Sequence, residues 1–307
     1  MATTLSSDYH PFRSTEARDR YHAYYDSLEM KSSPSEERMV VNTTHAATLV
    51  RITGSAGAPP LVIHPGTWAH SLDYPQAFVE PLSASYRVYR IDDPWDLGRC
   101  VSTRPLGSVQ DTMHWLDELL DALGLTRTVF LFGISKGAWR IAEYALHAPE
   151  RLAGVIWMSP ALVVSRASMR GLFDVIYMLP VMARPTVRSV ARGMRPLCAT
   201  FEREDPDGFR AYIEGISIGL QCFAKVPIDA RARVLRDDEL SGLKVPVLYM
   251  TGEHDTLAAV EPAVSRLRKL GPRAEVTVFP GTGHDLISLE PGTVASRMLE
   301  FLGTRSV

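Results

Sequence analysis

The stretch Leu131-Phe-Gly-Ile-Ser-Lys-Gly-Ala138 lies at the junction of two different sequence patterns. Residues 128–132 form a continuous apolar run, typical of a buried strand, and residues 136–147 have the length and spacing of a helix. Between them, Gly133, Ser135 and Gly137 match G-x-S-x-G, a strand–turn–helix motif that holds a serine on a strained turn. Bulky residues at the two glycine positions would collide with the neighbouring strand and helix. The motif therefore predicts an exposed Ser135 hydroxyl beside the positive end of a helix, the setting of a nucleophile.

Apolar runs and helical segments alternate on both sides of this turn. Continuous apolar strands separated by helices are typical of a mostly parallel sheet with helices on both faces. Upstream, a charged segment with several tyrosines suits a leader helix, and two short runs suit a hairpin. The predicted strands are 39–42, 48–53, 61–64, 87–91, 128–132, 154–158, 246–250 and 276–279, and the predicted helices are 13–30, 74–83, 109–123, 136–147, 262–270 and 293–301.

The alternation stops between residues 162 and 240, which contain helical segments and no convincing strand. An insertion of this length is too long for a bare loop in a compact domain. We interpret it as a helical cap over the edge where the strands end, because open α/β sheets keep their sites there. The predicted organisation is a core of residues 1–161 and 241–307, with residues 1–37 as the leader, and a cap of residues 162–240.

A nucleophilic serine needs a base, and the base needs a group that orients it. In proteins with this motif the chain order is serine, acid, histidine. Asp255 follows a predicted strand and His284 lies in a glycine-bracketed loop after the next one, so both are expected at the sheet edge that holds Ser135. Glu253 and Asp285 are rival carboxylates, and Asp255 also suits a helix N-cap, but it lies deepest in its loop. We predict a triad of Ser135, His284 and Asp255.

Negative charge that develops on a tetrahedral intermediate needs two backbone N–H donors, which form an oxyanion hole. One expected donor is the N–H of Lys136, the residue after the serine. The other is expected in the turn His64-Pro-Gly-Thr-Trp68, where proline has no N–H and glycine lets the backbone approach a substrate. We favour Thr67 and place Trp68 second, although these five residues also fit an ordinary strand-ending turn.

Together, residues 133–137, 252–255 and 283–284, preceded by His64-Pro-Gly, resemble the bacterial carboxylesterases of the α/β-hydrolase superfamily. The similarity covers nearly the whole chain, and the aromatic segment 21–28 is similar to the start of naproxen-type carboxylesterases. The resemblance implies an α/β-hydrolase fold and a ping-pong acyl-enzyme mechanism without cofactor or metal. Two positions depart from the family pattern: the usual His-Gly of the oxyanion turn is His64-Pro-Gly here, and Lys136 replaces a residue that is commonly neutral. The charge of Lys136 is expected either to attract anionic substrates or to point into solvent.

The cap combines apolar and basic segments. We expect Phe173, Tyr177, Met178 and Met182 to line a substrate pocket, although packing of the cap onto the body explains them equally well. Arginines also recur at helical spacing in the cap. The face that they form suits either solvent or an acidic partner, such as an acyl carrier protein that delivers a thioester. These arginines are Arg184, Arg188, Arg192 and Arg195.

Composition excludes several classes of protein. Hydrophobic residues make up 46% of the 307 residues and charged residues 22%, so the chain can build a packed core. A formal net charge of −2 argues against a nucleic-acid partner. The first twenty residues lack the apolar segment of a secretory signal, and no apolar run is long enough to cross a membrane. Three scattered cysteines suit a reducing compartment, so we expect a cytoplasmic protein.

Three hypotheses for function follow from these features. The leading one is a serine hydrolase that cleaves a carboxylic ester of a small, fairly apolar substrate through an acyl-enzyme intermediate. The second is a thioesterase, cyclase or acyltransferase of a biosynthetic pathway with the same triad. The third, a binding protein without turnover, is disfavoured because serine, acid and histidine are all present in the expected order. The sequence predicts no particular oligomeric state.

Overall fold

The computed structural model describes residues 11–31, 36–126, 128–178, 181, 183–224, 232–257, 259–271 and 273–305, without the side chains of Val175 and Tyr177. Within these ranges the strands form a single sheet in the order β1-β2-β4-β3-β6-β7-β8-β9, and β5 pairs with β2. Strands β4, β3, β6, β7, β8 and β9 run parallel, whereas β2 is antiparallel to its neighbours. The strands are β1 (Glu37–Asn42), β2 (Ala46–Thr53), β3 (Pro60–His64), β4 (Arg87–Ile91), β5 (Val101–Ser102), β6 (Val129–Ile134), β7 (Leu152–Met158), β8 (Val247–Gly252) and β9 (Ala274–Phe279).

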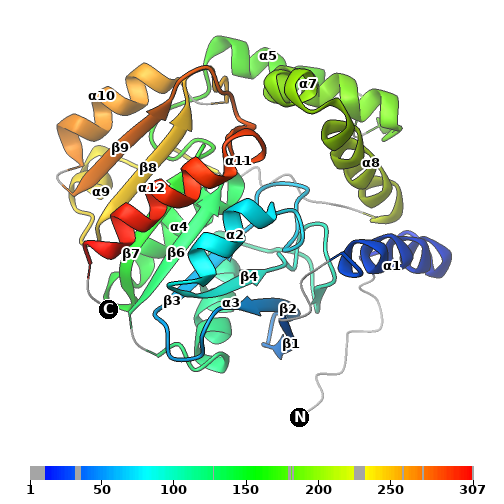
Figure 1. Ribbon diagram of the computed structural model, residues 1–307, viewed down its shortest axis with the longest axis horizontal. Coiled ribbons are helices and arrows are strands. Elements are labelled where there is room, and N and C mark those ends of the chain that lie inside the picture. The colour runs from blue at the N-terminus through cyan, green and yellow to red at the C-terminus, as the bar shows by residue number, and fades with distance from the viewer. Residues whose placement is uncertain are drawn as a thin grey trace.

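Helices cover both faces of the sheet (Figure 1). One apolar cluster joins alternate strand residues such as Leu131 and Val155 to helices α3 (Val109–Ala122), α4 (Lys136–His147), α9 (Asp237–Ser241) and α10 (Val260–Leu270). The intervening residues, such as Phe130 and Phe132, face α2 (Gln76–Ser83) and α12 (Pro291–Gly303) in a second cluster. Strands that are buried on both faces explain the continuous apolar runs of the sequence.

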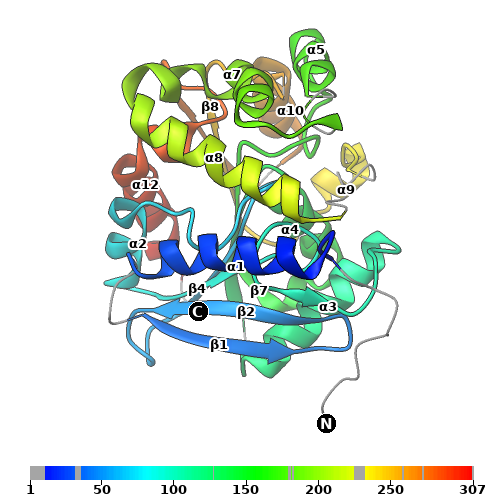
Figure 2. The ribbon, with the colours of Figure 1, turned by 90° about the vertical axis from the view of Figure 1, so that its right-hand side faces the viewer.

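Three cap helices lie over the edge of the sheet where the parallel strands end (Figures 1 and 2). They are α5 (Met169–Tyr177), α7 (Val187–Glu204) and α8 (Pro206–Cys222), and α7 and α8 share an apolar cluster with the leader helix α1 (Thr15–Glu29). No strand occurs among the described residues between β7 and β8. Helix α9 starts inside the predicted cap, 162–240, and ends one residue beyond it, but its Leu240 packs with the helices that cover the sheet.

Helix α7 is bent near its middle. Pro196 lies inside the helix, and Cys198 has non-helical backbone angles (φ −126°, ψ 29°). A proline removes one helical hydrogen bond and its ring disturbs the preceding turn, which produces such a kink. Downstream of the kink, the N–H of Phe201 donates to the carboxylate of Asp285 at 2.8 Å. The bend therefore attaches the cap to the loop that follows β9.

Candidate active site

Ser135 occupies the strained turn between β6 and α4. Its backbone angles, φ 52° and ψ −113°, are unusual for a residue with a side chain. A Cβ added to Gly133 would lie 2.5 Å from the carbonyl carbon of Gly137, and one added to Gly137 would lie 2.4 Å from the carbonyl oxygen of Pro65. Both glycines are therefore required by close backbone contacts. The N–H of Ser135 donates to the carbonyl of Met158 at 2.9 Å, which fixes the turn at the end of β7.

Asp255 and His284 meet at the same edge of the sheet. The Nδ1 atom of His284 lies 3.0 Å from Oδ2 of Asp255, and the Asp255 side chain is fully buried. The other oxygen, Oδ1, accepts the N–H of Leu257 at 3.0 Å. Burial alone raises the pKa of Asp255, but the charge of His284 and its hydrogen bond outweigh burial and hold the pKa below its ordinary value. For His284, burial lowers the pKa, but the charge and hydrogen bond of Asp255, together with the charge of Asp285, outweigh burial and raise the pKa.

The two rival carboxylates contact other partners. Glu253 is half exposed and accepts the backbone N–H of Gly281 at 3.0 Å. Asp285 is buried and accepts the N–H groups of Phe201 and Gly283. Of the three carboxylates in these loops, Asp255 is the one that contacts the imidazole of His284. Glu253 and Asp285 instead fix the shape of the loop that carries the histidine.

The turn after β3 packs against the serine turn. A Cβ on Gly66 would lie 3.7 Å from Cβ of Ser135, so this backbone runs beside the serine. The N–H of Trp68 donates to Oδ1 of Asp96 at 3.0 Å, and Trp68 has a positive φ of 60°. Among the described residues, the N–H of Thr67 has no hydrogen-bond partner. Of the two donors predicted in this turn, Trp68 is thus already engaged and Thr67 is free.

The side chain of Lys136 is buried and ion-paired, so the expectation that it points into solvent is wrong. The residue is only 5% exposed, and its Nζ atom lies 2.9 Å from Asp93 and also pairs with Asp96. Burial of an ammonium group is unfavourable unless it is paired, and the two carboxylates provide that pairing. Its backbone N–H is at the first position of α4, where no helical partner exists.

Comparison with known proteins assigns this chain to a family. The family model described as serine aminopeptidase, S33, matches residues 60–292, a span that contains Ser135, Asp255 and His284. The chain belongs to this family. Two curated relatives from Bacillus subtilis (strain 168) are named as carboxylesterases. Carboxylesterase YbfK is 28% identical over 92% of this chain and 93% of its own length, and uncharacterized carboxylesterase nap is 25% identical over 93% of each.

Solved structures share the fold of this hydrolase. Naproxen esterase (carboxylesterase NP) from Bacillus subtilis has a TM-score of 0.83 at 23% identity, and covers 94% of this chain and 99% of its own. Carboxylesterase CesB (YbfK) from the same organism has a TM-score of 0.79 at 22% identity, with the same coverage. The predicted α/β-hydrolase fold is confirmed, with its mostly parallel sheet and helices on both faces. The molecule is a carboxylesterase-like enzyme of the α/β-hydrolase superfamily.

Of the four pocket residues predicted in the cap of the hydrolase, the structure describes the side chains of Phe173 and Met178. Phe173 is 57% exposed, and Met178 is partly buried against the cluster shared by the cap and the leader helix. Met182 and the side chain of Tyr177 lie outside the described residues. Helix α5 instead contacts the acid loop, because Asp174 accepts the hydroxyl of Thr256 at 2.6 Å. Their role as a substrate lining stays a prediction.

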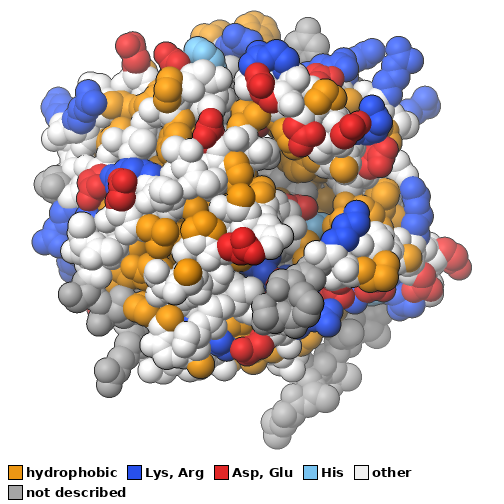
Figure 3. Space-filling view, viewed as in Figure 1, with side chains coloured by type: hydrophobic (Ala, Val, Ile, Leu, Met, Phe, Trp, Pro, Cys, Tyr) orange, Lys and Arg blue, Asp and Glu red, His pale blue; other side chains and the backbone are white. Residues whose placement is uncertain are grey.

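Basic side chains gather over the cap helices in the space-filling view (Figure 3). Arg195 pairs with Glu202 at 2.8 Å, so it is not available to a partner without breaking that ion pair. Arg184, Arg188 and Arg192 are exposed and have no ion pair within the described part of the chain. Helix α7 therefore carries Arg188, Arg192 and Arg195 of the predicted basic face, whereas Arg184 lies before the helix begins, so the four arginines do not share one helix.

Sequence patterns missed the polar groups that surround the serine turn. Asp93, Asp96 and Arg140 are almost completely buried and form the surroundings of Lys136. In α8, burial and the charges of Cys198, Asp73, Asp285 and Asp96 raise the pKa of the Tyr212 hydroxyl. An acidic run, Asp92-Asp-Pro-Trp-Asp96, directly after an apolar strand was the one available signal for this cluster.

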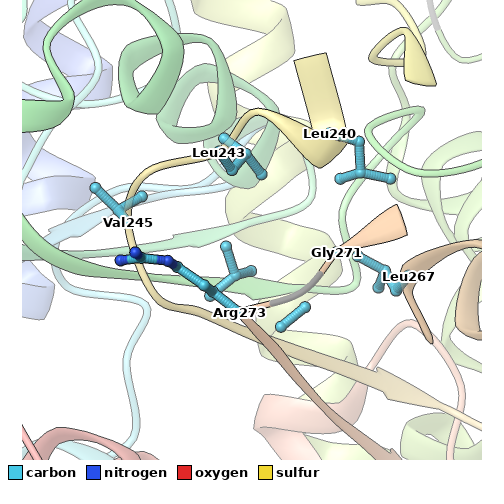
Figure 4. Close-up of a pocket in the computed structure, with 8 residues that line it drawn as sticks. Leu240, Leu243, Val245, Leu267, Gly271 and Arg273 are labelled. Carbon is cyan, nitrogen blue, oxygen red and sulfur yellow. The ribbon is translucent and has the colours of Figure 1, made fainter. Parts of the chain in front are cut away.

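The surface of the hydrolase is hollowed between the cap and the body, and a histidine side chain is visible inside the hollow (Figure 3). A separate small pocket lies at the opposite edge of the sheet (Figure 4). It has a volume of about 10 Å³ and is lined mainly by apolar side chains at the amino ends of β8 and β9. That is room for roughly one water molecule, so this pocket cannot hold an organic substrate. No helix in the described ranges has the length and apolarity of a membrane span.

Proposed function

We propose that this enzyme hydrolyses carboxylic esters through an acyl-enzyme, with Ser135 as the nucleophile. The observation that supports this most directly is the 3.0 Å contact between Nδ1 of His284 and the buried carboxylate of Asp255, at the sheet edge that also carries the strained Ser135 turn. An imidazole held by a carboxylate at one nitrogen presents its other nitrogen as a base. That arrangement serves proton transfer from a serine hydroxyl.

The reaction proceeds in two halves. Nε2 of His284 takes the proton of the Ser135 hydroxyl while Oγ forms a bond to the acyl carbon, and the proton then passes to the departing alcohol. Water attacks the resulting acyl-serine with His284 again as the base, which releases the acid and restores Ser135. In both halves the oxyanion is stabilised by the N–H of Lys136, at the positive end of α4, and the N–H of Thr67.

Labelling with a fluorophosphonate tests the assignment of the nucleophile. We expect wild-type protein to be modified at Ser135, and Ser135→Ala to lose labelling and lower kcat by several orders of magnitude. Thr67→Ala is a matched control, since it keeps the backbone N–H and removes only the side chain. Labelling that persists in Ser135→Ala, or that maps to another serine, contradicts the proposal.

We propose small, fairly apolar acyl or aromatic esters as substrates. The apolar residues of the cap support this preference, and Phe173, Tyr177, Met178 and Met182 are the proposed lining. A panel of p-nitrophenyl esters of increasing chain length tests it: Phe173→Ala and Met178→Ala should change KM and chain-length preference more than they change labelling of Ser135. Unchanged selectivity in both variants would mean that these residues only pack the cap.

A second candidate is acyl transfer from a thioester, favoured by the exposed arginines Arg188 and Arg192 of α7 and Arg184 just before it. An acidic acyl carrier protein would dock there, and Arg184→Glu with Arg188→Glu should then raise KM for a carrier-bound thioester without changing KM for a free ester. Equal effects on both substrates contradict carrier docking.

The cytoplasmic location also stays a proposal, supported by three free, buried thiols, Cys100, Cys198 and Cys222.

A further inference from the structure

Four charged side chains are buried directly behind the serine turn. Asp93, Asp96, Lys136 and Arg140 are exposed by 0 to 5% only. Lys136 lies between the two carboxylates, and Arg140, one turn further along α4, pairs with Asp93. The two acids and two bases balance in charge. Burying four charges is costly, and a well-packed apolar cluster would usually be at least as stable. Their presence beside the proposed nucleophile therefore calls for a role other than stability.

Asp96 makes contacts that the other three residues do not make. Its Oδ1 accepts the N–H of Trp68 at 3.0 Å and that of Leu97 at 2.7 Å, while its Oδ2 pairs with Lys136. One carboxylate thus connects the turn after β3 to the first residue of α4. Trp68 lies 28 positions and Lys136 40 positions away along the chain. These two connected segments carry the two donors of the proposed oxyanion hole.

The conformation of Trp68 depends on such an anchor. A positive φ is unfavourable for a residue with a bulky side chain and persists where the surroundings enforce it. A Cβ added to the preceding residue, Gly66, would lie 3.5 Å from the carbonyl oxygen of Ile134 and 3.7 Å from Cβ of Ser135. The backbone before Thr67 therefore packs against the serine turn. Thr67 lies between this contact and the anchored Trp68, and its N–H is unpaired in the described structure. The orientation of the Thr67 peptide is therefore set from both ends.

We propose that Asp96 is a positioning residue that sets both walls of the oxyanion hole. By binding the N–H of Trp68, it removes that group as a donor and directs the N–H of Thr67 toward the reacting carbonyl. By binding the side chain of Lys136, it holds the first peptide of α4, whose N–H is the second donor. This role rests on the proposed ester hydrolysis, and it explains why a lysine replaces the usual neutral residue after the serine.

Single replacements of Asp96 test whether it positions the oxyanion donors. Asp96→Ala should lower kcat for a p-nitrophenyl ester about 100- to 1,000-fold with KM changed less than threefold, as expected when an oxyanion donor is displaced. Binding of a trifluoromethyl ketone, which forms a tetrahedral adduct with the serine, should weaken in parallel. Asp96→Asn keeps an acceptor for Trp68 and should retain at least ten times more activity than Asp96→Ala. Asp117→Ala, which removes ion pairs on α3 far from the serine, should leave kcat unchanged.

The variant Asp96→Ala with Lys136→Met gives the decisive comparison. Removing both charges should restore Tm toward the wild-type value, because no unpaired charge is left in this contact. The loss of kcat should remain, because the anchor of Trp68 is still absent. Recovery of kcat together with Tm would overturn the proposal and make Asp96 a mere counter-ion of Lys136.

One measurement does not depend on turnover. Hydrogen exchange at the Trp68 amide should accelerate at least tenfold in Asp96→Ala and much less in Asp96→Asn. If wild-type protein turns over no ester and Ser135 is not labelled, the proposed function fails, while this exchange still reports whether Asp96 anchors the turn. Unchanged exchange in Asp96→Ala overturns the positioning role whatever the activity.

Discussion

His284 lies next to two carboxylates that contact different parts of the molecule. Asp255 contacts the imidazole itself at 3.0 Å, whereas Asp285, the next residue in the chain, contacts the cap through the N–H of Phe201. Both carboxylates favour the protonated imidazole, and together they outweigh the effect of burial on its pKa. The protonated form cannot accept the Ser135 proton, so this electrostatic environment has a direct effect on the pH dependence of the reaction.

We expect kcat/KM to increase with pH through an apparent pKa above 6.5, the ordinary value for histidine, because the raised pKa keeps His284 protonated and inactive at lower pH. Asp255→Asn removes the charge that favours the proton, so the midpoint should move to lower pH. The same change should lower kcat by roughly 1,000- to 10,000-fold, since the amide no longer holds the required tautomer. A pH–rate profile with an activated ester measures both effects.

Glu253→Gln is the matched control for that variant, because Glu253 accepts the backbone N–H of Gly281 in the next loop, a bond that glutamine can also accept. Its activity should stay within a few-fold of the wild-type value. The reverse ranking of the two variants would assign the acid to Glu253. Near-normal activity in both, with His284→Ala inactive, would place the acid elsewhere on the sheet edge.

His64 should make the stability of the fold depend on pH. Its side chain is buried near Asp93, Arg140 and Lys136, and burial lowers its pKa to about 4. The unfolded chain takes up a proton near pH 6.5 and the folded chain does not, so the free energy of unfolding should fall as pH decreases from 6.5 to 4. The contribution is about 3 kcal/mol at most. Urea denaturation across this range should show a smaller fall for His64→Gln, whereas the surface variant His147→Gln should follow the wild type.

At the scale of elements, the bend in α7 connects the cap to the catalytic loop. Asp285→Ala leaves the N–H of Phe201 without its acceptor, which should destabilise the protein by roughly 1 to 3 kcal/mol. Exchange of the Phe201 amide should accelerate more than exchange in β6, because the loss is local. Asp285→Asn keeps an acceptor oxygen and should behave nearly as the wild type. Equal protection of Phe201 in all three proteins would show that the cap is held by apolar packing alone.

The longer strands and helices were predictable because their pattern of apolar residues repeats along each element. The predicted strand 87–91 and helix 136–147 coincide with β4 and α4, since apolar spacing and flanking turn residues mark both ends. Elements that are too short to show such a repeating pattern, such as β5 and α11 (Leu286–Leu289), were missed. The contact between Asp96 and Lys136 spans 40 positions and follows no period, so nothing in the sequence pairs these two residues.

At the scale of the whole molecule, the leader helix joins the antiparallel edge of the body to the cap (Figure 2). Arg51 of β2 is fully buried and pairs with Glu29 at the end of α1. On the cap side, Phe12 forms a β-bridge with Phe223, and Tyr21 contacts both rings. The fold class followed from the alternation of strands and helices. This attachment did not, because it depends on contacts between segments at distant positions.

We expect Tyr21→Ala to loosen the cap. Removing a fully buried aromatic ring costs about 3 to 5 kcal/mol, and the cavity would lie between α1 and α8. Limited proteolysis should then cut within α8 before it cuts the sheet. Met30→Ala is the control at the exposed end of the same helix and should leave the cleavage pattern unchanged. First cleavage in the sheet for Tyr21→Ala would mean that the leader stabilises the body rather than the cap.

The contact between the leader helix and the cap also affects how the chain folds during its synthesis. Arg13 and Leu220, which are in contact in the folded protein, lie 207 positions apart. At a typical rate of about 5 to 20 residues per second, the ribosome needs roughly 10 to 40 seconds to deliver the second after the first. During that interval Phe12, Tyr21 and Tyr25 have no cap to pack against. The apolar side chains of the leader helix that face the cap therefore stay uncovered until translation has passed Phe223.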